Sequence, residues 1–210
     1  MADLAVIVPT VNRHECLPSL LANVHSATAT RHRVYFVVES EDKQTLLILS
    51  GLSAIGEHVN LIGEYGSYVQ SANIGVHSSL EPYLLVANDD VVFHPEWDTR
   101  ALAAMNGSVR VVGIDQGDGR TESFFLVDRR YLDEYPGPFY HTEYISQYCD
   151  TEFTDLAKKR GVWAVADGAL IEHMHWTLGK SEVDQNYGIA LAAVPHDEAL
   201  YHRRRVARQD

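Results

Sequence analysis

Residues 83–90 read Tyr83-Leu84-Leu85-Val86-Ala87-Asn88-Asp89-Asp90. The short apolar run is typical of a buried strand, and the three polar residues mark the point where that strand ends. Adjacent carboxylates at such a place repel each other, and removing them from water is unfavourable unless a cation lies close. Mg²⁺ and Mn²⁺ suit carboxylate oxygens. The alternative is a solvated turn after the strand, because Asn and Asp favour turns.

Three other short apolar runs precede this strand, and amphipathic helical patterns separate all four. The expected strands are Leu4–Val8, Val34–Val38, Val59–Ile62 and Tyr83–Ala87, and the expected helices cover residues 17–24, 45–52 and 69–80. Alternating strands and helices predict an α/β domain with a doubly wound, mostly parallel sheet and right-handed crossovers. Gly75 lies inside the third helical pattern, where glycine costs about 1 kcal/mol relative to alanine, so a close packing contact or ligand is expected there.

Polar segments follow three of the expected strands. They are Pro9–Arg13, Glu39–Asp42 and Asn88–Asp90. Ligands of doubly wound sheets bind at the carboxyl ends of the strands. We therefore expect these three segments to converge on one cleft.

The second half of the chain has a different character. Further strands are expected at Val109–Ile114, Ser123–Val127, Val162–Val165 and Ala169–His175, and a long helix is expected over His141–Arg160, with Gly161 as its C-terminal stop. No linker marks a boundary, so residues 1–210 are expected to form a single domain. Residues 181–210 are expected to be a C-terminal tail or lid.

The charge and cysteine content exclude several classes of protein. Lys and Arg number 17 against 29 Asp and Glu, a formal net charge of −12, which disfavours binding to nucleic acid or an anionic membrane.

Cys16 and Cys149 form no CxxC motif, which excludes a zinc ribbon and a thioredoxin site. Two reduced thiols are expected, and one disulfide remains open. No apolar stretch approaches the length of a membrane span, and the N-terminus lacks a signal-peptide pattern, so a cytoplasmic protein is expected.

Two other motifs carry candidate chemistry. In His173-Met174-His175, strand alternation places both imidazoles on one face, where one or both could bind a metal; a structural or exposed pair is the commoner alternative. Asp150 would share a helix face with Gln147 and Thr154 and is a candidate general base, against the alternative of a solvated helix acid. The chain has neither a G-x-x-x-x-G-K-[ST] nor a G-x-G-x-x-G phosphate loop, so a nucleotide substrate would depend more on a metal.

The order of these motifs resembles the GT-A nucleotide-sugar glycosyltransferases, particularly the family 2-like group. The resemblance runs from about residue 5 to residue 176. The segments that carry it are Val6–Arg13, Val37–Ser40, Gln70–Gly75, Tyr83–Val91 with Pro95, Gly137–Phe139, and Asp150–Phe153 with Lys159–Gly161. It implies a Rossmann-like, mostly parallel sheet flanked by helices, with a small antiparallel extension on the acceptor side. Residues 1–107 would form the nucleotide-sugar-binding half, and residues 108–180 the acceptor and catalytic half.

The resemblance also implies an activity and a set of site residues. A metal-dependent, inverting glycosyltransferase would use Mn²⁺ or Mg²⁺ to move a sugar from a nucleoside-diphosphate sugar to a hydroxyl of a glycan, small molecule or protein. Asp90 and His173, with His175 as runner-up, would bind the metal. Asp150, with Glu152 as runner-up, would be the catalytic base. The nucleotide-sugar-binding residues would be Pro9, Thr10, Asn12, Arg13, Glu39, Asn73, Asn88 and Asp89.

Three positions depart from the family pattern. Asn88 replaces the first aspartate of the family's D-x-D motif, Glu39 replaces the aspartate that reads the base, and Cys149 precedes Asp150 where the family has a glutamate. The base is therefore open among uracil, thymine and guanine. Two other functions remain open: a nucleotidyltransferase, and a non-catalytic sugar- or nucleotide-binding protein on a decayed transferase fold. Release of a nucleoside diphosphate, rather than a monophosphate or pyrophosphate, separates all three.

Overall fold

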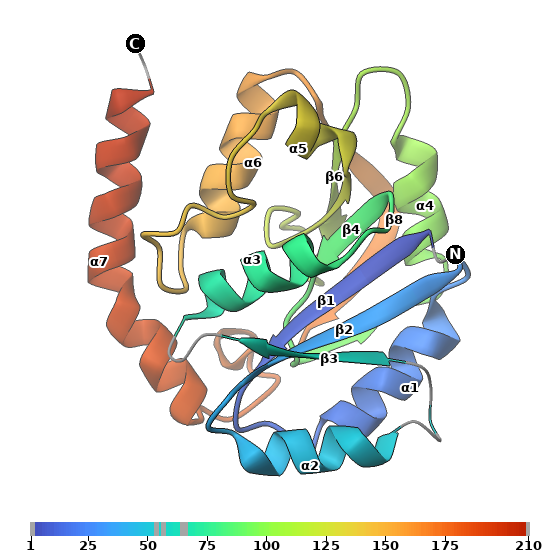
Figure 1. Cartoon of the computed structure of the whole chain (residues 1–210). Coiled ribbons are helices and arrows are strands. Elements are labelled where there is room, and N and C mark those ends of the chain that lie inside the picture. The colour runs from blue at the N-terminus through green and yellow to red at the C-terminus, as the bar shows by residue number, and fades with distance from the viewer. Residues whose placement is uncertain (1–2, 53–54, 56–57, 64–66, 209–210) are drawn as a thin grey trace.

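The computed structural model describes residues 3–52, 55, 58–63 and 67–208 (Figure 1). Within these ranges the chain forms an eight-stranded sheet in the order β3-β2-β1-β4-β7-β6-β8-β5. The strands are β1 (Leu4–Thr10), β2 (His32–Glu39), β3 (His58–Gly63), β4 (Tyr83–Val86), β5 (Val91–Phe93), β6 (Val111–Asp115), β7 (Phe124–Asp128) and β8 (Trp163–His173). The helices are α1 (Leu17–Ala27), α2 (Lys43–Gly51), α3 (Tyr68–Ser78), α4 (Trp97–Ala104), α5 (Arg130–Glu134), α6 (Cys149–Lys159), the short 3-10 helix η2 (Trp176–Leu178) and α7 (Gln185–Ala207).

Strands β1 to β4 form the parallel part of the sheet. β1 pairs in parallel with both β2 and β4, and β2 pairs in parallel with β3. Every residue of β1 is buried, as expected for a central strand covered on both faces. The expected alternation of strands and helices over this half is confirmed.

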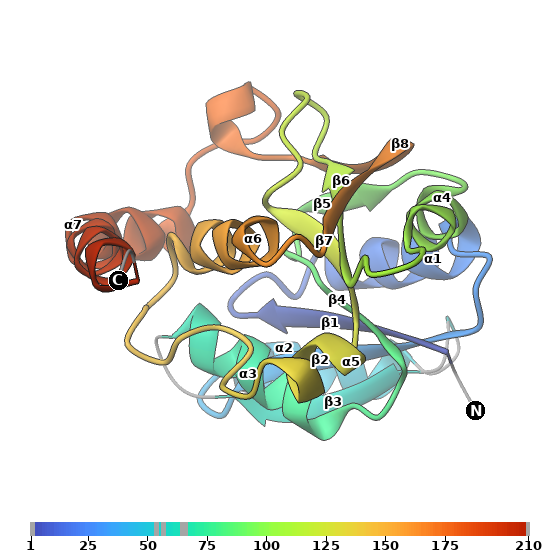
Figure 2. The ribbon, with the colours of Figure 1, turned by 90° about the horizontal axis from the view of Figure 1, so that it is seen from above.

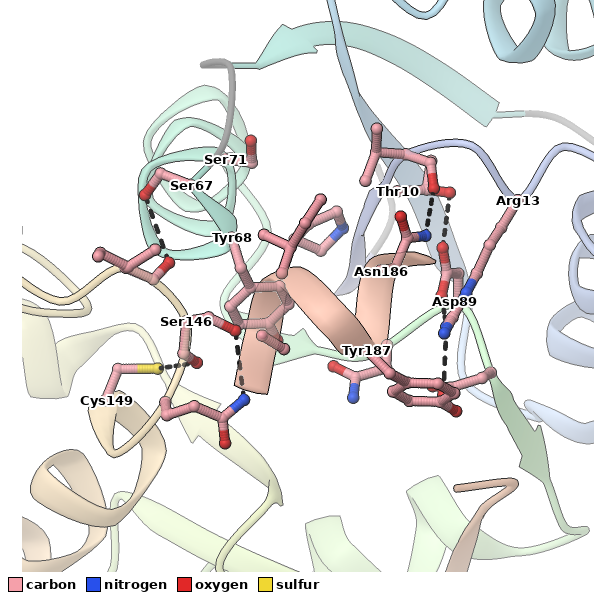
Figure 3. A pocket seen from close by; sticks show the side chains of 18 of the residues that line it. Thr10, Arg13, Ser67, Tyr68, Ser71, Asp89, Ser146, Cys149, Asn186 and Tyr187 are labelled. Atoms are coloured by element: carbon pink, nitrogen blue, oxygen red, sulfur yellow. Dashed lines mark hydrogen bonds and ion pairs between the residues drawn. The ribbon is translucent and has the colours of Figure 1, made fainter. Parts of the chain in front are cut away.

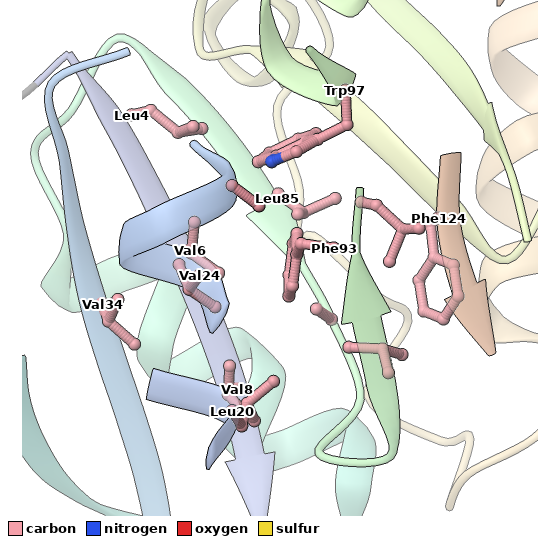
Figure 4. Close-up of a cluster of buried hydrophobic side chains, with 14 of the residues drawn as sticks. Leu4, Val6, Val8, Leu20, Val24, Val34, Leu85, Phe93, Trp97 and Phe124 are labelled. Atoms are coloured by element: carbon pink, nitrogen blue, oxygen red, sulfur yellow. The ribbon is translucent and has the colours of Figure 1, made fainter. Parts of the chain in front are cut away.

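Two apolar clusters cover the opposite faces of the sheet. Leu4, Val6 and Val8 of β1 pack with α1 and with Trp97 of α4 (Figure 4), whereas Ala5 and Ile7 pack with α3 and α6 on the other face. This alternation follows from the two-residue period of a strand. The two helical layers hold the strands in place, so the positions of the strand ends are fixed by the core.

The second half of the sheet is mixed rather than parallel. β7 runs antiparallel to both β4 and β6, and β5 runs antiparallel to β8, whereas β6 and β8 are parallel. The expected α/β class with an antiparallel extension is confirmed. Strand β5 and helices α4, α5 and α7 were not expected, and the strands expected at Val162–Val165 and Ala169–His175 are one strand, β8.

The helix expected over His141–Arg160 is wrong in its first half, because α6 begins only at Cys149. Tyr148 adopts a left-handed conformation with φ 61°, which stops the helix from extending backwards. The backbone N–H groups of residues 145, 146 and 147 instead donate to the carboxylate of Asp197 on α7, at 2.8 to 3.0 Å. Gln147 is therefore not on a helix face with Asp150. The expected stop at Gly161 is confirmed, with φ 70° at that residue.

Residues 181–210, expected to form a tail or lid, are largely the long helix α7. Asp184 caps its N-terminus by accepting a hydrogen bond from the Tyr187 backbone N–H. The arrowhead of β1 points toward the side of the molecule on which α7 lies (Figures 1 and 2). Cys16 and Cys149 are both free thiols.

Gly75 generates a prediction about packing. A Cβ there would overlap Ile7 Cγ2 of β1 and lie 3.1 Å from Val37 Cγ2 of β2. We expect Gly75→Ala to destabilise the protein by about 1–3 kcal/mol, because overpacking outweighs the helix propensity of alanine. Gly188→Ala is the matched control, since a Cβ at Gly188 in α7 meets nothing within 4 Å. Chemical denaturation checks both, and equal stability of the two variants would contradict this packing.

Candidate active site

A cavity of about 490 Å³ opens at the carboxyl ends of β1, β2 and β4 (Figure 3). The three polar segments that follow these strands all contribute to it, as the sequence predicted. The predicted site residues that line the cavity are Pro9, Thr10, Asn12, Arg13, Glu39, Asn88, Asp89, Asp90, Asp150, His173 and His175. Asn73 and Glu152 do not line it.

The loop after β1 is held by carboxylates of two other loops. Asn12 adopts a left-handed conformation with φ 54°, which asparagine tolerates, and its backbone N–H donates to Asp42 at 2.6 Å. Thr10 Oγ1 donates to Asp89 Oδ2 at 2.7 Å. These contacts join the ends of β1, β2 and β4 into one rigid rim.

Arg13 lies among three carboxylates at this rim. Its guanidinium is 2.7 Å from Asp89, 3.2 Å from Asp90 and 2.8 Å from Asp184. Burial alone would lower the pKa of Arg13, but the three acids together raise it, so the side chain remains charged. Burial raises the pKa of Asp89, and Arg13 opposes that rise. Arg13 thus offsets the repulsion that the sequence predicted for adjacent acids.

The two oxygens of Asp90 have different surroundings. Oδ2 accepts a hydrogen bond of 2.5 Å from the Tyr187 hydroxyl and faces Arg13. Oδ1 is buried without a hydrogen bond and lies 3.2 Å from His173 Nε2. Burial acts to raise the pKa of Asp90, but His173, Tyr187 and Arg13 hold it well below its ordinary value. Asp90 is therefore an ionised carboxylate with one oxygen free for a ligand.

The pair formed by Asp90 Oδ1 and His173 Nε2 fits a divalent cation. Two ligands at about 2.1 Å from one ion and at right angles to each other are about 3 Å apart. The Asn88 amide nitrogen also lies 3.2 Å from His173 Nε2. An unprotonated Nε2 has a single lone pair, so a bound cation would replace the Asn88 contact. Within the described ranges no cluster of three or more His, Cys, Asp and Glu residues is placed to hold a metal. A cation here would take its remaining ligands from phosphate oxygens and water.

His175 has a structural partner of its own. Its Nδ1 lies 2.8 Å from Thr177 Oγ1 and accepts from the Thr177 backbone N–H, which caps η2. Its ring packs against His173 and Tyr187, with centroids 4.9 and 4.8 Å away. Burial lowers the pKa of His175, with a further contribution from His173.

Asp150 lines the cavity from the first turn of α6. Its Oδ1 accepts hydrogen bonds from the backbone N–H and hydroxyl of Thr151, at 2.7 and 3.3 Å. Burial raises the pKa of Asp150, and no ion pair reaches its carboxylate from any described residue. Figure 3 shows its neighbour Cys149 across the cavity from Asp89. The carboxylate is thus placed to accept a proton from a molecule in the cavity.

Glu152 and Asn73 are committed to structural contacts. Glu152 is 4% exposed and pairs with Arg204 and Arg208 of the C-terminal segment, each at 2.9 Å, while the Tyr144 hydroxyl also donates to it. Both amide atoms of Asn73 bond to the backbone of Tyr140, at 2.8 Å. Neither side chain is free to contact a ligand.

Several cavity residues were not singled out from the sequence. Tyr68 and Ser71 of α3 line it, as do Tyr140, Asn186 and Tyr187. Asp184 followed by Tyr187 is a recognisable helix start. Nothing in the local pattern, however, indicates that this helix start reaches the strand ends.

A family model described as glycosyl transferase family 2 matches residues 5–159. The chain belongs to this family. No curated protein sequence matches it. The match covers the strand ends and Asp150 of this family 2 domain but stops before His173 and Tyr187.

Solved structures share the fold of this family 2 domain. A mannosyltransferase from Pyrobaculum calidifontis, in complex with GDP-Man and Mn²⁺, has a TM-score of 0.70 at 13% identity, over 82% of this chain and 56% of that one. TarS 1-349 from S. aureus has a TM-score of 0.65 at 18% identity, over 81% and 60%. Glucosyl-3-phosphoglycerate synthase from Mycobacterium tuberculosis, with Mn²⁺, UDP and glucosyl-3-phosphoglycerate, has a TM-score of 0.65 at 8% identity, over 92% and 77%.

The chain thus spans somewhat more than half the length of the first two of these proteins. None of the helices in the described part of the chain has the length and apolar content needed to cross a bilayer.

The Glu152 ion pairs generate a second prediction. We expect Glu152→Gln to lower stability by about 2 kcal/mol, the range for hydrogen bonds to charged groups. Burial opposes ionisation of Glu152, but Arg204, Tyr144 and Arg208 lower its pKa. The native protein is therefore more stable than Glu152→Gln by the whole of this amount at neutral pH. The difference disappears as pH falls through the lowered pKa of Glu152.

Thermal denaturation at pH 7 and pH 3 measures this effect. Glu143→Gln is the control, because that side chain is 67% exposed. A Glu152→Gln protein as stable as the native one at pH 7 would contradict the structural role.

Proposed function

We propose that this family 2 domain is a metal-dependent, inverting glycosyltransferase that moves a sugar from a nucleoside-diphosphate sugar to an acceptor hydroxyl. The observation that carries the proposal is the convergence of the Asp90–His173 pair and Asp150 on one cavity. A volume of about 490 Å³ is in the range of small-molecule sites. The solved mannosyltransferase and synthase structures contain Mn²⁺ with GDP-Man or UDP, which supports the donor class.

The rim formed by the ends of β1, β2 and β4 is the donor side. The loop Pro9–Arg13 and Glu39 would border the nucleoside, and Glu39 can accept a hydrogen bond from a base N–H. Asp90 and His173 would hold Mn²⁺ or Mg²⁺, which when bound stabilises the negative charge on the departing diphosphate. Arg13 adds a fixed positive charge close to the same place.

Asp150 is the proposed base. Asp150 lines the cavity from the first turn of α6, and its neighbour Cys149 lies across the cavity from Asp89 (Figure 3). It would take the proton from the acceptor hydroxyl while that oxygen bonds to the anomeric carbon and the diphosphate leaves. Attack opposite the leaving group inverts the anomeric configuration. No Lys or Arg lines this side within the described residues, and Tyr68, Tyr140 and Ile145 provide apolar surface, which favours an acceptor that is uncharged near its reacting hydroxyl.

The product identifies the reaction. We would incubate the protein with Mn²⁺ and a panel of UDP-, GDP- and dTDP-sugars and identify the nucleotide released. A nucleoside diphosphate supports glycosyl transfer. Release of a monophosphate or pyrophosphate would instead indicate chemistry at phosphorus, and no release with any donor would favour a binding protein.

We expect Asp90→Ala to abolish the Mn²⁺-dependent binding of a nucleoside diphosphate while the fold is retained. Asp90 supplies the free oxygen of the metal pair. Thermal shifts with UDP and GDP, with and without Mn²⁺, measure this, since ligand at 100 times its dissociation constant adds about 2.7 kcal/mol of stability. An Asp90→Ala protein that keeps its Mn²⁺-dependent shift would remove Asp90 from the metal site.

We expect Asp150→Asn to lower turnover by about 10²-fold or more, the usual contribution of acid–base catalysis, with donor affinity nearly unchanged. The base acts only when ionised, and burial raises the pKa of Asp150. Turnover should therefore fall as pH decreases, with a midpoint above about 3.9, the ordinary value for aspartate.

Initial rates and donor binding across pH test this expectation. Glu152→Gln is the matched control and should keep its turnover. A fully active Asp150→Asn protein would refute the base assignment.

A further inference from the structure

A residue outside the family-matched segment reaches the proposed metal ligand. Tyr187, in the first turn of α7, is 7% exposed, and its hydroxyl donates to Asp90 Oδ2 at 2.5 Å. We propose that Tyr187 is a positioning residue that orients Asp90 so that only Oδ1 is presented to the cation. This inference rests on the metal site of the proposed function.

The inference rests on the different contacts of the two carboxylate oxygens of Asp90. Oδ2 is occupied by the Tyr187 hydroxyl and by Arg13 Nη1 at 3.2 Å. Oδ1 is buried, has no hydrogen bond, and faces His173 Nε2 at 3.2 Å. A free carboxylate can rotate and bind a cation through either oxygen or both. Here one oxygen is held, so the other is directed at the histidine.

Tyr187 is itself fixed by its surroundings. The guanidinium of Arg13 lies over its ring, 4.6 Å from the centroid, and the ring of His175 packs edge-on at 4.8 Å. Its backbone N–H is bound by Asp184, which also pairs with Arg13. Asn186 next to it donates to the Val11 carbonyl at 2.6 Å, which joins α7 to the loop after β1. Figure 3 shows Tyr187 beside Asp89 and Arg13.

Removal of the Tyr187 hydroxyl distinguishes two roles: positioning Asp90 for the cation, or competing with the cation for an oxygen of Asp90. Outer partners that orient metal ligands typically contribute 10- to 100-fold in metal affinity. If Tyr187 positions Asp90, Tyr187→Phe weakens Mn²⁺ binding by this factor. If the hydroxyl instead occupies an oxygen that the cation needs, the same substitution strengthens binding. The direction of the change therefore decides between the two.

Tyr201→Phe is a closely matched control. Tyr201 lies on the same helix, has the same 7% exposure, and its hydroxyl donates to the carboxylate of Asp155 at 2.5 Å. It does not line the cavity. Both variants lose one phenol–carboxylate hydrogen bond from α7, so a purely structural effect should be similar in the two.

The experiment is titration of the 210-residue chain with Mn²⁺ alone by isothermal calorimetry, with melting temperatures measured in parallel. We expect Tyr187→Phe to bind Mn²⁺ 10- to 100-fold more weakly, Tyr201→Phe to bind it like the native protein, and both variants to melt at similar temperatures. UDP affinity without metal should be the same in all three proteins. An effect confined to Mn²⁺ affinity is one that a structural role would not produce.

Four outcomes would overturn the inference. Unchanged Mn²⁺ affinity in Tyr187→Phe shows that Asp90 needs no positioning, and tighter binding shows competition; in both cases the proposed transferase stands. Equal weakening in Tyr187→Phe and Tyr201→Phe shows a general effect of α7. A native protein that binds no Mn²⁺, alone or with UDP or GDP, removes both this inference and the metal dependence of the proposed function.

Discussion

The positive charge of Arg13 among Asp89, Asp90 and Asp184 is the interaction on which the site depends. Without it, two adjacent carboxylates would face each other at the end of a buried strand. The same guanidinium lies over the Tyr187 ring and so connects the first strand loop with the last helix. A single side chain thereby offsets the repulsion among these acids and holds the loop after β1 against the start of α7.

The sequence was most informative where local pattern and fold agree. The strands around Val6, Phe36 and Leu85 are buried on both faces, so their apolar runs and the polar residues that end them are visible without a structure. The convergence of Thr10, Glu39 and Asp90 on one cavity followed from the rule that parallel strands end at one edge. Asp150 was expected near the cleft from its motif, although Gln147, one of the two residues expected to share its helix face, lies outside α6.

The remaining features depend on contacts between distant residues. The segment 141–148 was expected to be helical, but Asp197, some 50 residues later, binds three of its backbone N–H groups and holds it as a loop. Such a contact is favourable only after α7 has packed, and no window of sequence contains both partners. Tyr187 and Asn186 were missed for the same reason. The sequence favoured Asp150 and left Glu152 as runner-up, and it gave no sign that Arg204 and Arg208 hold Glu152 away from the cavity.

The segment that the family model matches ends before His173, Tyr187 and Asp197. This affects which parts of the cavity can change in evolution while the matched segment stays the same. Residues 5–159 supply the strand ends and Asp150, whereas β8 and α7 supply the second member of the proposed metal pair and the carboxylate that shapes the 145–147 loop. Substitutions at His173 or Asp197 would therefore alter the proposed metal pair or the 145–147 loop. Substitutions at Asp184 or Asn186 would also reach Arg13 and Val11 in the loop after β1. Under the proposed function, two proteins that match over residues 5–159 but differ at the positions of His173 and Asp197 would share the donor loops and differ in the metal pair and the 145–147 loop.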